Sequence, residues 1–155
     1  MHLIKDDISI VIAGEAGQGI QVIENLLVNI LKHNGYNVFT IKEYMSRIRG
    51  GVNSIQIRCA SFPVHSFVEK INILIPFNVE SITRLKNRIT DDTIIIGERE
   101  KLNIDKIIDI PLTRISTELG NVLYSNTISV GVISSLLNVG LDFSINYIRD
   151  YFSNK

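Results

Sequence analysis

The chain has one cysteine, Cys59, among its 155 residues. A lone thiol excludes a disulfide within the chain, a cysteine-ligated iron–sulfur cluster and a cysteine-rich zinc site. The three histidines have no carboxylate or cysteine partners at ligand spacing, so we expect no metal site. These absences favour a protein of a reducing cytoplasm, with Cys59 as a small buried hydrophobic residue.

Excess charge and long apolar runs are also missing. Lys+Arg and Asp+Glu both total 16, which disfavours a general nucleic-acid binder and fits a subunit of a larger assembly. Lys5, Asp6 and Asp7 interrupt any apolar region near the start, so we expect no signal peptide. No apolar run is long enough to cross a bilayer, so we expect no membrane partner.

The hydrophobic fraction of 45% is enough for the core of one domain over residues 1–155. Short apolar segments typical of strands alternate with helical patterns, and they are residues 8–13, 37–41, 52–58, 71–75, 93–96 and 107–110. The segment 52–58 alternates and predicts a strand with one face in water. This order predicts a three-layer α/β/α sandwich with a mostly parallel, Rossmann-like sheet.

Helices are predicted between these strands and after the last one. The first has an apolar face from Ile20 to Leu31 and Gly35 just beyond its end, and the second covers residues 79–88 with Asn78 as its N-cap. The chain is predicted to be helical from Pro111 onward. Two apolar stripes are expected to be buried there, the second with Asp142 as its cap, and they are Ile128, Val132, Leu136 and Leu137, then Ile145, Ile148 and Phe152.

A glycine turn follows the first predicted strand, with Gly14, Gly17 and Gly19 around Gln18. A strand that turns directly into a helix leaves free backbone N–H groups at the helix N-terminus, and these suit an anion such as a phosphate. The spacing reverses the dinucleotide fingerprint, and no lysine follows as it does in a P-loop, so ATP or GTP hydrolysis is not expected. A nucleotide site with Glu43 as the ribose-binding carboxylate stays an alternative. Another alternative is that the glycines only allow the strand, the turn and the helix to pack closely.

A second segment, Ser46-Arg47-Ile48-Arg49-Gly50-Gly51, lies about thirty residues further on. In extended backbone Arg47 and Arg49 point to the same side, and their guanidinium groups suit phosphate or carboxylate. If a strand carries this segment back beside the glycine turn, the two build one anion-binding crevice. The alternative is a solvated turn whose arginines pair with Glu43 or another carboxylate.

These residues resemble the gamma subunit, or gamma domain, of 2-oxoacid:ferredoxin oxidoreductases. The resemblance begins with the glycine turn and continues through Glu43, Tyr44, Ser46, Arg49, Gly50, Gly51, Asn53, Ser54, Gln56, Ile57 and Arg58. Later parts of it are Pro76-Phe77-Asn78 and Ser125-Asn126 with Gly131. Ala16, Asn72 and Pro76 depart from the usual pattern, and Ala16 is typical of the version fused at the N-terminus of an alpha-type chain.

The resemblance implies a role in the oxidative decarboxylation of a 2-oxoacid to an acyl-CoA. It implies that thiamine diphosphate, magnesium and the iron–sulfur clusters belong to partner subunits of alpha, beta and ferredoxin-like delta type, which pass electrons to ferredoxin. This chain lacks the Gly-Asp-Gly…Asn pattern for thiamine diphosphate, so we expect it to be inactive alone. Its expected job is to close the shared active site and help seat coenzyme A.

The predicted cofactor-binding residues combine the two glycine segments, and they are Gly14, Gly17, Gln18, Gly19, Ser46, Arg47, Arg49, Gly50, Gly51 and Asn53. We expect N–H groups of the first segment to meet the phosphates of coenzyme A and Arg49 to be the charged clamp, with Ser46 and Asn53 orienting the turn or binding the ligand. No catalytic residue is predicted. The remaining alternatives are a free-standing NAD(P)-binding oxidoreductase domain and a pure assembly module.

Overall fold

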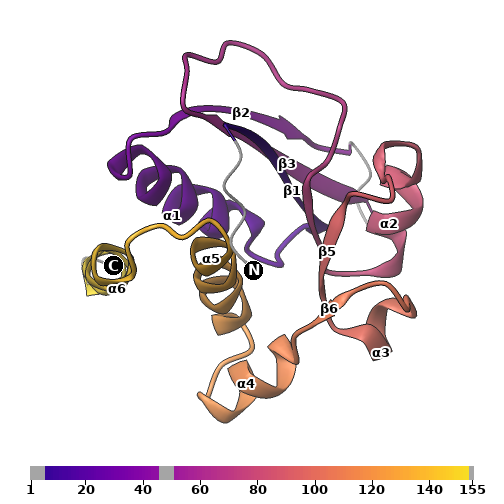
Figure 1. Cartoon of the computed structure of the whole chain (residues 1–155). Helices are drawn as coiled ribbons and strands as arrows, with labels where there is room; N and C mark the ends of the chain where they lie inside the picture. Colours follow the sequence, from indigo (N-terminus) through magenta and orange to yellow (C-terminus); the bar gives the residue numbers. More distant parts are fainter. Residues whose placement is uncertain (1–5, 46–50, 154–155) are drawn as a thin grey trace.

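The computed structural model describes residues 6–45 and 51–153 of the chain. A six-stranded sheet forms its centre, in the order β2-β3-β1-β4-β5-β6 (Figure 1). The strands are β1 (Asp7–Glu15), β2 (Asn37–Glu43), β3 (Val52–Ala60), β4 (Ile73–Pro76), β5 (Ile94–Gly97) and β6 (Ile108–Asp109). The six strands match the predicted segments closely.

The sheet is mostly parallel, as predicted. β4 pairs parallel to β1, β5 to β4, and β6 to β5, whereas β3 runs antiparallel to both of its neighbours, β1 and β2. β1 and β2 therefore point the same way, but β3 lies between them. This insertion differs from the Rossmann unit, in which consecutive parallel strands are adjacent.

Helices cover both faces of the sheet and complete the predicted sandwich (Figure 1). The helical elements are α1 (Ile20–His33), α2 (Val79–Leu85), the 3-10 turn η1 (Lys86–Arg88), α3 (Arg99–Leu102), α4 (Leu112–Glu118), α5 (Tyr124–Leu136) and α6 (Leu141–Ser153). α1 and α5 pack together on one face, with α6 against both, and α2 packs on the other. In the part of the chain that the structure describes, no helix is long and apolar enough to cross a membrane.

The core divides into two layers because side chains of a strand alternate between the faces of a sheet. Ile8, Ile10 and Ile12 of β1 belong to the cluster that includes the buried side of α1, and Val11 and Ala13 belong to the cluster that includes Leu85 of α2. Their exposed fractions are all near zero. A strand buried on both faces explains the continuous apolar run of β1.

The prediction that β3 has one wet face is wrong. Its polar side chains are covered by the connection that leads to β4, and most of the strand is buried. Gln56 donates from Nε2 to the Ser9 hydroxyl and to the Val68 carbonyl, both at 2.7 Å. Arg58 forms a two-point ion pair with Asp7 at 2.9 and 2.8 Å. The polar residues of β3 therefore find partners in the protein rather than in water.

The predicted cap residues are right for two helices and wrong for the last. Asn78 Oδ1 accepts a hydrogen bond from the Ser81 N–H at 2.9 Å, and Gly35 has a φ of +85° beyond α1. Asp142, by contrast, lies inside α6, which starts at Leu141.

The two apolar stripes expected to be buried are only partly so. In the first stripe, Ile128, Val132 and Leu136 are half-buried and Leu137, just beyond α5, is buried. The fully buried positions of α5 itself are Asn126, Ser129, Val130, Ile133 and Ser134. On α6, Ile145 and Phe152 are exposed, and Phe143, Tyr147, Ile148 and Tyr151 pack against the core. Both helices have apolar residues on more than one side, so the periodicity alone does not select the packed face.

Candidate functional site

The sheet reverses its connections between β1 and β4. The helix after β1 crosses to one face and the helix after β4 crosses to the other, while the two strands pair in parallel from Ile10 with Ile73 to Ala13 with Pro76. Such a switch point leaves a crevice beyond the carboxyl ends of the strands, and ligands of open α/β sheets bind there. The predicted glycine turn lies at this place.

The turn from β1 into α1 requires glycine at two of its positions. Gly17 and Gly19 have φ values of +91° and +73°, a left-handed backbone that other residues adopt only at a cost. The Gln18 side chain closes the turn, because its Oε1 accepts a hydrogen bond from the Glu15 N–H at 2.7 Å. Among the described residues, apart from its chain neighbours, Gly17 has no atom within 4 Å of the position that its Cβ would take, so these residues leave room there for an approaching group.

Gly14 has a packing role. A Cβ at this position would lie 2.4 Å from Gln18 Oε1 and 3.1 Å from the Cβ of Phe77. Phe77 directly follows β4, and its N–H donates to the Ala13 carbonyl at 2.8 Å, so the ring is held beside the glycine turn. Glycine at position 14 thus allows the Phe77 side chain and the Gln18 carboxamide to share the space above β1.

The connection between β2 and β3 starts and ends at the same edge of the sheet. Val52 pairs with Glu15 and Asn53 pairs with Gly14, so the start of β3 lies beside the end of β1. Asn53 Oδ1 accepts a hydrogen bond from the Met45 N–H at 3.2 Å across the base of this connection, and Gly51 is half-buried there. The other predicted site residues, Ser46, Arg47, Arg49 and Gly50, lie outside the described residues.

Glu43 has protein partners and lies two strands from β1. Its Oε2 is 3.3 Å from Arg84 Nη2 and accepts a hydrogen bond from the Ser54 hydroxyl, also at 3.3 Å. In a Rossmann cofactor site the ribose carboxylate ends the strand next to β1. Here that neighbour is β3, so the arrangement does not favour Glu43 as a ribose ligand.

The side chain of Asn126, at the start of α5, lies against Gly19 of the glycine turn. Its side chain is 3% exposed, and a Cβ on Gly19 would lie 2.2 Å from its Nδ2. Its Oδ1 has no hydrogen-bond partner among the residues that the structure describes. The N-termini of α1 and α5 thus meet, with a buried carboxamide between them.

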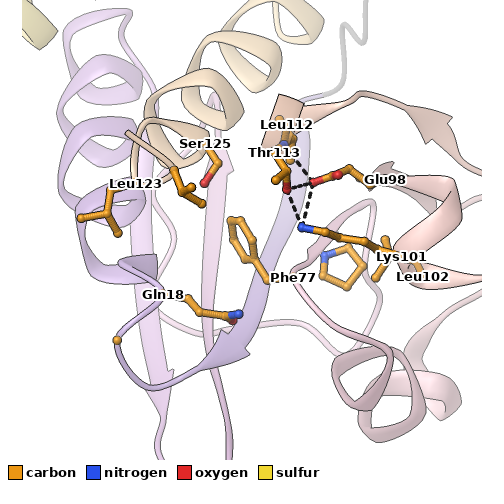
Figure 2. A pocket seen from close by; sticks show the side chains of 13 residues that line it. Gln18, Phe77, Glu98, Lys101, Leu102, Leu112, Thr113, Leu123 and Ser125 are labelled. Carbon is orange, nitrogen blue, oxygen red and sulfur yellow. Dashed lines mark hydrogen bonds and ion pairs between the residues drawn. The ribbon is translucent and has the colours of Figure 1, made fainter. Parts of the chain in front are cut away.

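A cleft of about 210 Å³ opens next to the turn, beyond the ends of β4 and β5. Its apolar wall consists of Pro76, Phe77, Leu102, Leu112, Val122 and Leu123. Its polar groups are Gln18, Glu98, Lys101, Thr113 and Ser125. The Phe77 ring lies in the middle, with Gln18 and Leu123 on one side and Thr113, Glu98 and Lys101 on the other (Figure 2).

The polar wall is held by one compact network. Glu98 Oε1 accepts hydrogen bonds from the Thr113 N–H at 3.0 Å and from the Thr113 hydroxyl at 2.6 Å. Lys101 Nζ lies 3.4 Å from the same Glu98 oxygen and also donates to the Thr113 hydroxyl. This network places an ammonium group at the cleft, and its charge is partly balanced by Glu98.

Apart from Gly17 and Gln18, the cleft residues were not predicted as site residues. They come from the ends of β4 and β5, from α3 and α4, and from the connection into α5. The signal that could have found them is the position of Phe77 and Glu98 directly after buried strands, since parallel strands end at one edge of a sheet.

Cys59 is buried in the core, away from this edge, at the other end of β3. Burial raises the pKa of its thiol to about 12, and the negative charge of Asp7 adds to the shift. No group of three or more His, Cys, Asp or Glu side chains that could hold a metal ion occurs within residues 6–45 and 51–153.

Comparison with known proteins assigns the family. The model of the family "Pyruvate ferredoxin/flavodoxin oxidoreductase" matches residues 9–155. The chain belongs to this family. Its curated relatives include the alpha subunit of the 2-oxoacid:ferredoxin oxidoreductase of Saccharolobus solfataricus, 28% identical over 100 residues, which are 64% of this chain and 16% of that one. The alpha subunit from a Sulfolobus species is 33% identical over 75 residues, 48% of this chain and 12% of the relative.

Solved structures share the fold. A 2-oxoglutarate:ferredoxin oxidoreductase from Magnetococcus marinus, with 2-oxoglutarate, coenzyme A and succinyl-CoA bound, superimposes with a TM-score of 0.85 at 22% identity, over 97% of this chain and 28% of that one. The gamma subunit of a keto/oxoacid ferredoxin oxidoreductase from Geobacter sulfurreducens gives 0.76 at 11% identity, covering 91% and 84%. A pyruvate oxidoreductase subunit from Thermotoga maritima gives 0.74 at 19% identity, covering 95% and 86%.

The share of each relative that is covered differs between the two kinds of match. The chain spans about a sixth of the length of the first curated relative, an alpha subunit, but most of the length of the two separate structural subunits. The same fold therefore occurs both as a separate subunit and as part of a longer chain.

Proposed function

We propose that this chain is the gamma-type domain of a 2-oxoacid:ferredoxin oxidoreductase, and that it closes the shared active site and helps seat coenzyme A. The observation that carries the proposal is the register of β3 on β1. Because Val52 pairs with Glu15 and Asn53 with Gly14, the connection with the two arginines ends beside the glycine turn. This register supports a crevice at the switch point to which both segments contribute.

The chemistry of this crevice suits the phosphates of coenzyme A. The turn leads into α1, a helix of 14 residues, whose N-terminus offers unpaired N–H groups and a partial positive charge. Gly17 lets the backbone come close to a ligand, whereas Gly19 makes room for the Asn126 side chain. Arg47 and Arg49 are the proposed charged clamp, since a guanidinium group binds phosphate with two parallel hydrogen bonds. Asn53 orients the connection through its hydrogen bond to Met45.

The rest of the reaction is assigned to partner subunits. The single cysteine cannot hold a cluster, so the iron–sulfur centres, and with them thiamine diphosphate and magnesium, are proposed to lie on alpha-, beta- and delta-type partners that pass electrons to ferredoxin. The Magnetococcus marinus neighbour, solved with coenzyme A and succinyl-CoA, supports coenzyme A as the ligand class. We expect the chain to be inactive without its partner subunits. We also propose that the assembled enzyme works in the cytoplasm.

The test uses the enzyme assembled with its partner subunits. Arg49→Ala should raise the KM for coenzyme A by about 10- to 100-fold, since a hydrogen bond to a charged group contributes about 1.5–3 kcal/mol. Arg149→Ala on α6 is the matched control, because this arginine is exposed and its guanidinium donates a hydrogen bond to Asn146 of its own helix. An unchanged KM for coenzyme A in the Arg49 variant would rule out the clamp and favour a pure assembly role.

A further inference from the structure

β2 forms one edge of the sheet, because it pairs with β3 and with no other strand in the described part of the chain (Figure 1). An edge strand presents unpaired backbone N–H and C=O groups, and proteins usually protect such an edge with a lysine, a proline, a bulge or a very short strand. The opposite edge, β6, has two residues, whereas β2 has seven, Asn37–Glu43, and no proline. β2 is therefore the edge that can accept another strand.

The charged side chains of β2 do not protect this edge. Lys42 Nζ lies 2.8 Å from Glu24 Oε2 on α1, and the hydrogen bond to this carboxylate holds the pKa of Lys42 above its ordinary value. Glu43 pairs with Arg84 of α2. Both charges are thus balanced within the chain, and the formal net charge of zero leaves little repulsion between two copies.

The register of the sheet shows which backbone groups of β2 point outward. The Ser61 N–H donates to the Asp6 carbonyl at 3.0 Å, in step with the pairing of β1 and β3, so the odd-numbered residues of β3 bond to β1. Backbone groups alternate in direction along an antiparallel strand, so the even-numbered residues of β3 bond to β2. Their partners there are Asn37, Phe39, Ile41 and Glu43. The N–H and C=O groups of Val38, Thr40 and Lys42 therefore point away from the sheet.

Two apolar side chains of β2 also lack a place in the core. Val38 packs on the cluster that includes α1. Phe39 and Ile41 lie on the opposite face of the strand, because side chains alternate, and both are half-buried. Neither of them belongs to the two core clusters of the described residues. A strand added at this edge would cover their remaining apolar surface, which favours binding.

A second β2 strand fits this edge in one antiparallel register. With a two-fold axis through Thr40, the middle residue of β2, Thr40 lies opposite its own equivalent and Val38 lies opposite Lys42 of the second copy. All three outward N–H groups of each copy then meet outward C=O groups, which makes six hydrogen bonds. An axis through Phe39 or Ile41 would keep only four of these bonds.

The side chains agree with this register. Phe39 lies opposite Ile41 of the second copy, in the non-hydrogen-bonded type of pair, in which side chains come closer together. An aromatic side chain and a β-branched one form a stabilising pair across two strands. The axis repeats this pair, so four apolar side chains gather on one face of the joined sheet.

We infer that a second copy of this chain binds at the β2 edge, and that the two sheets join into one sheet of twelve strands, six from each copy. The contact between two seven-residue strands is smaller than a standard protein interface, so we expect a dissociation constant in the micromolar range. The inference goes beyond the proposed function and does not depend on coenzyme A as the ligand.

The first experiment is sedimentation equilibrium of the full chain, at concentrations from about 1 to about 200 μM, which bracket the expected dissociation constant. The wild type should form dimers. Thr40→Pro should weaken the dimer at least tenfold, because it removes an outward N–H from each copy, and an edge strand tolerates proline where the N–H faces solvent. Thr40→Ser is the matched control, since it keeps the N–H, and it should change the dissociation constant less than threefold.

A side-chain variant avoids the folding risk of proline. Ile41→Lys places a charge beside Phe39 of the second copy, as lysines on natural edge strands do, and should also weaken the dimer at least tenfold. Ile145→Lys makes the same change on α6, where Ile145 is 52% exposed and distant from β2 in the sequence, and should leave the dimer intact. Circular dichroism of each variant confirms that the chain is folded.

A cross-link tests the register. Equivalent Thr40 residues would have Cα atoms about 5.5 Å apart, a distance that a disulfide can span. Equivalent Val38 residues would be four residues out of step, about 14 Å along the strand, which is too far. Oxidised Thr40→Cys should therefore migrate as a dimer on a non-reducing gel and Val38→Cys as a monomer. Cys59 is buried and should not form the link.

Each contrary outcome overturns the inference. A monomer over the whole concentration range would show that the edge does not bind a second copy, and a strand of a partner subunit on β2 in the assembled enzyme would then identify the true occupant. A dimer that Thr40→Pro and Ile41→Lys leave unchanged would place the interface elsewhere. A cross-link through Val38→Cys but not through Thr40→Cys would reject the pairing about Thr40.

Discussion

Substituting Gly19 with alanine should destabilise the chain more than the same substitution at Gly17. Two costs add at this position. The φ of +73° places an alanine in the left-handed region, which costs about 1–2 kcal/mol. Its Cβ would also lie 2.2 Å from Asn126 Nδ2, and Asn126 is 3% exposed, so it cannot move into solvent. Overpacking of this kind costs about 1–3 kcal/mol.

Gly17 is the matched control for this prediction. It has a φ of +91°, but no atom of the part of the chain that the structure describes, other than its own neighbours in sequence, lies within 4 Å of its Cβ position. Gly17→Ala therefore carries only the backbone cost of about 1–2 kcal/mol. The predicted loss in free energy of unfolding is about 2–5 kcal/mol for Gly19→Ala and about 1–2 kcal/mol for Gly17→Ala.

A double-mutant cycle isolates the steric part. Asn126→Ala alone should change stability by less than about 1 kcal/mol, because the lost packing is offset by removing a buried acceptor, Oδ1, that has no hydrogen-bond partner within residues 6–45 and 51–153. In the Gly19→Ala background the same change should restore about 1–3 kcal/mol, since it removes the clash. Urea unfolding of the 155-residue chain, followed by circular dichroism, measures each value.

The reasoning fails on either of two results. Equal destabilisation by Gly17→Ala and Gly19→Ala would mean that Asn126 does not pack on the turn. Additive effects of Gly19→Ala and Asn126→Ala, with no recovery in the double variant, would lead to the same conclusion. The contact between the N-termini of α1 and α5 would then be wrong.

Two further predictions concern single groups. Asn78→Ala should lower the free energy of unfolding by about 1 kcal/mol, because the N-cap bond to the Ser81 N–H is lost, and no change in the urea midpoint would contradict that role. The Cys59 thiol should not react with a thiol reagent in the folded chain at pH 8 and should react fully in denaturant, since it is buried. Burial raises the pKa of the Cys59 thiol from 9.0 to about 12, so the unfolded chain loses this proton at a lower pH than the folded chain does. The contribution of this group to the free energy of unfolding is therefore complete below about pH 9. It should fall by about 1.4 kcal/mol per pH unit as the pH rises from there toward about 12. A Cys59→Ala variant that shows the same fall would assign it to other groups.

The sequence predicts the positions of the strands along the chain well, but it predicts their order in the sheet less well. Continuous apolar runs such as residues 8–13 report burial directly, so β1, β4 and β5 lie where expected. The place of β3 depends on pairs between distant parts of the chain, such as Ile10 with Ile57, and no local pattern contains that information. Its wet face was predicted wrongly for the same reason, because the groups that cover Gln56 come from later segments.

The candidate site also has one part that the sequence predicts and one part that it does not predict. Glycine turns leave a local signal, since Gly17 and Gly19 adopt backbone angles that favour glycine. The cleft residues Lys101 and Thr113 lie on α3 and α4, helices of four and seven residues that are too short for a clear period. Only the sheet order brings them next to Phe77. The resemblance to a known family singled out Asn126, but it did not predict the contact of Asn126 with Gly19.

The most direct measurement is a structure of the assembled oxidoreductase with coenzyme A bound. The account predicts phosphate oxygens within about 2.7–3.1 Å of N–H groups in the turn from Gly17 to Gly19 and of the Arg49 guanidinium. Coenzyme A whose phosphates contact only partner subunits, with this turn facing water or a partner's side chains, would contradict it.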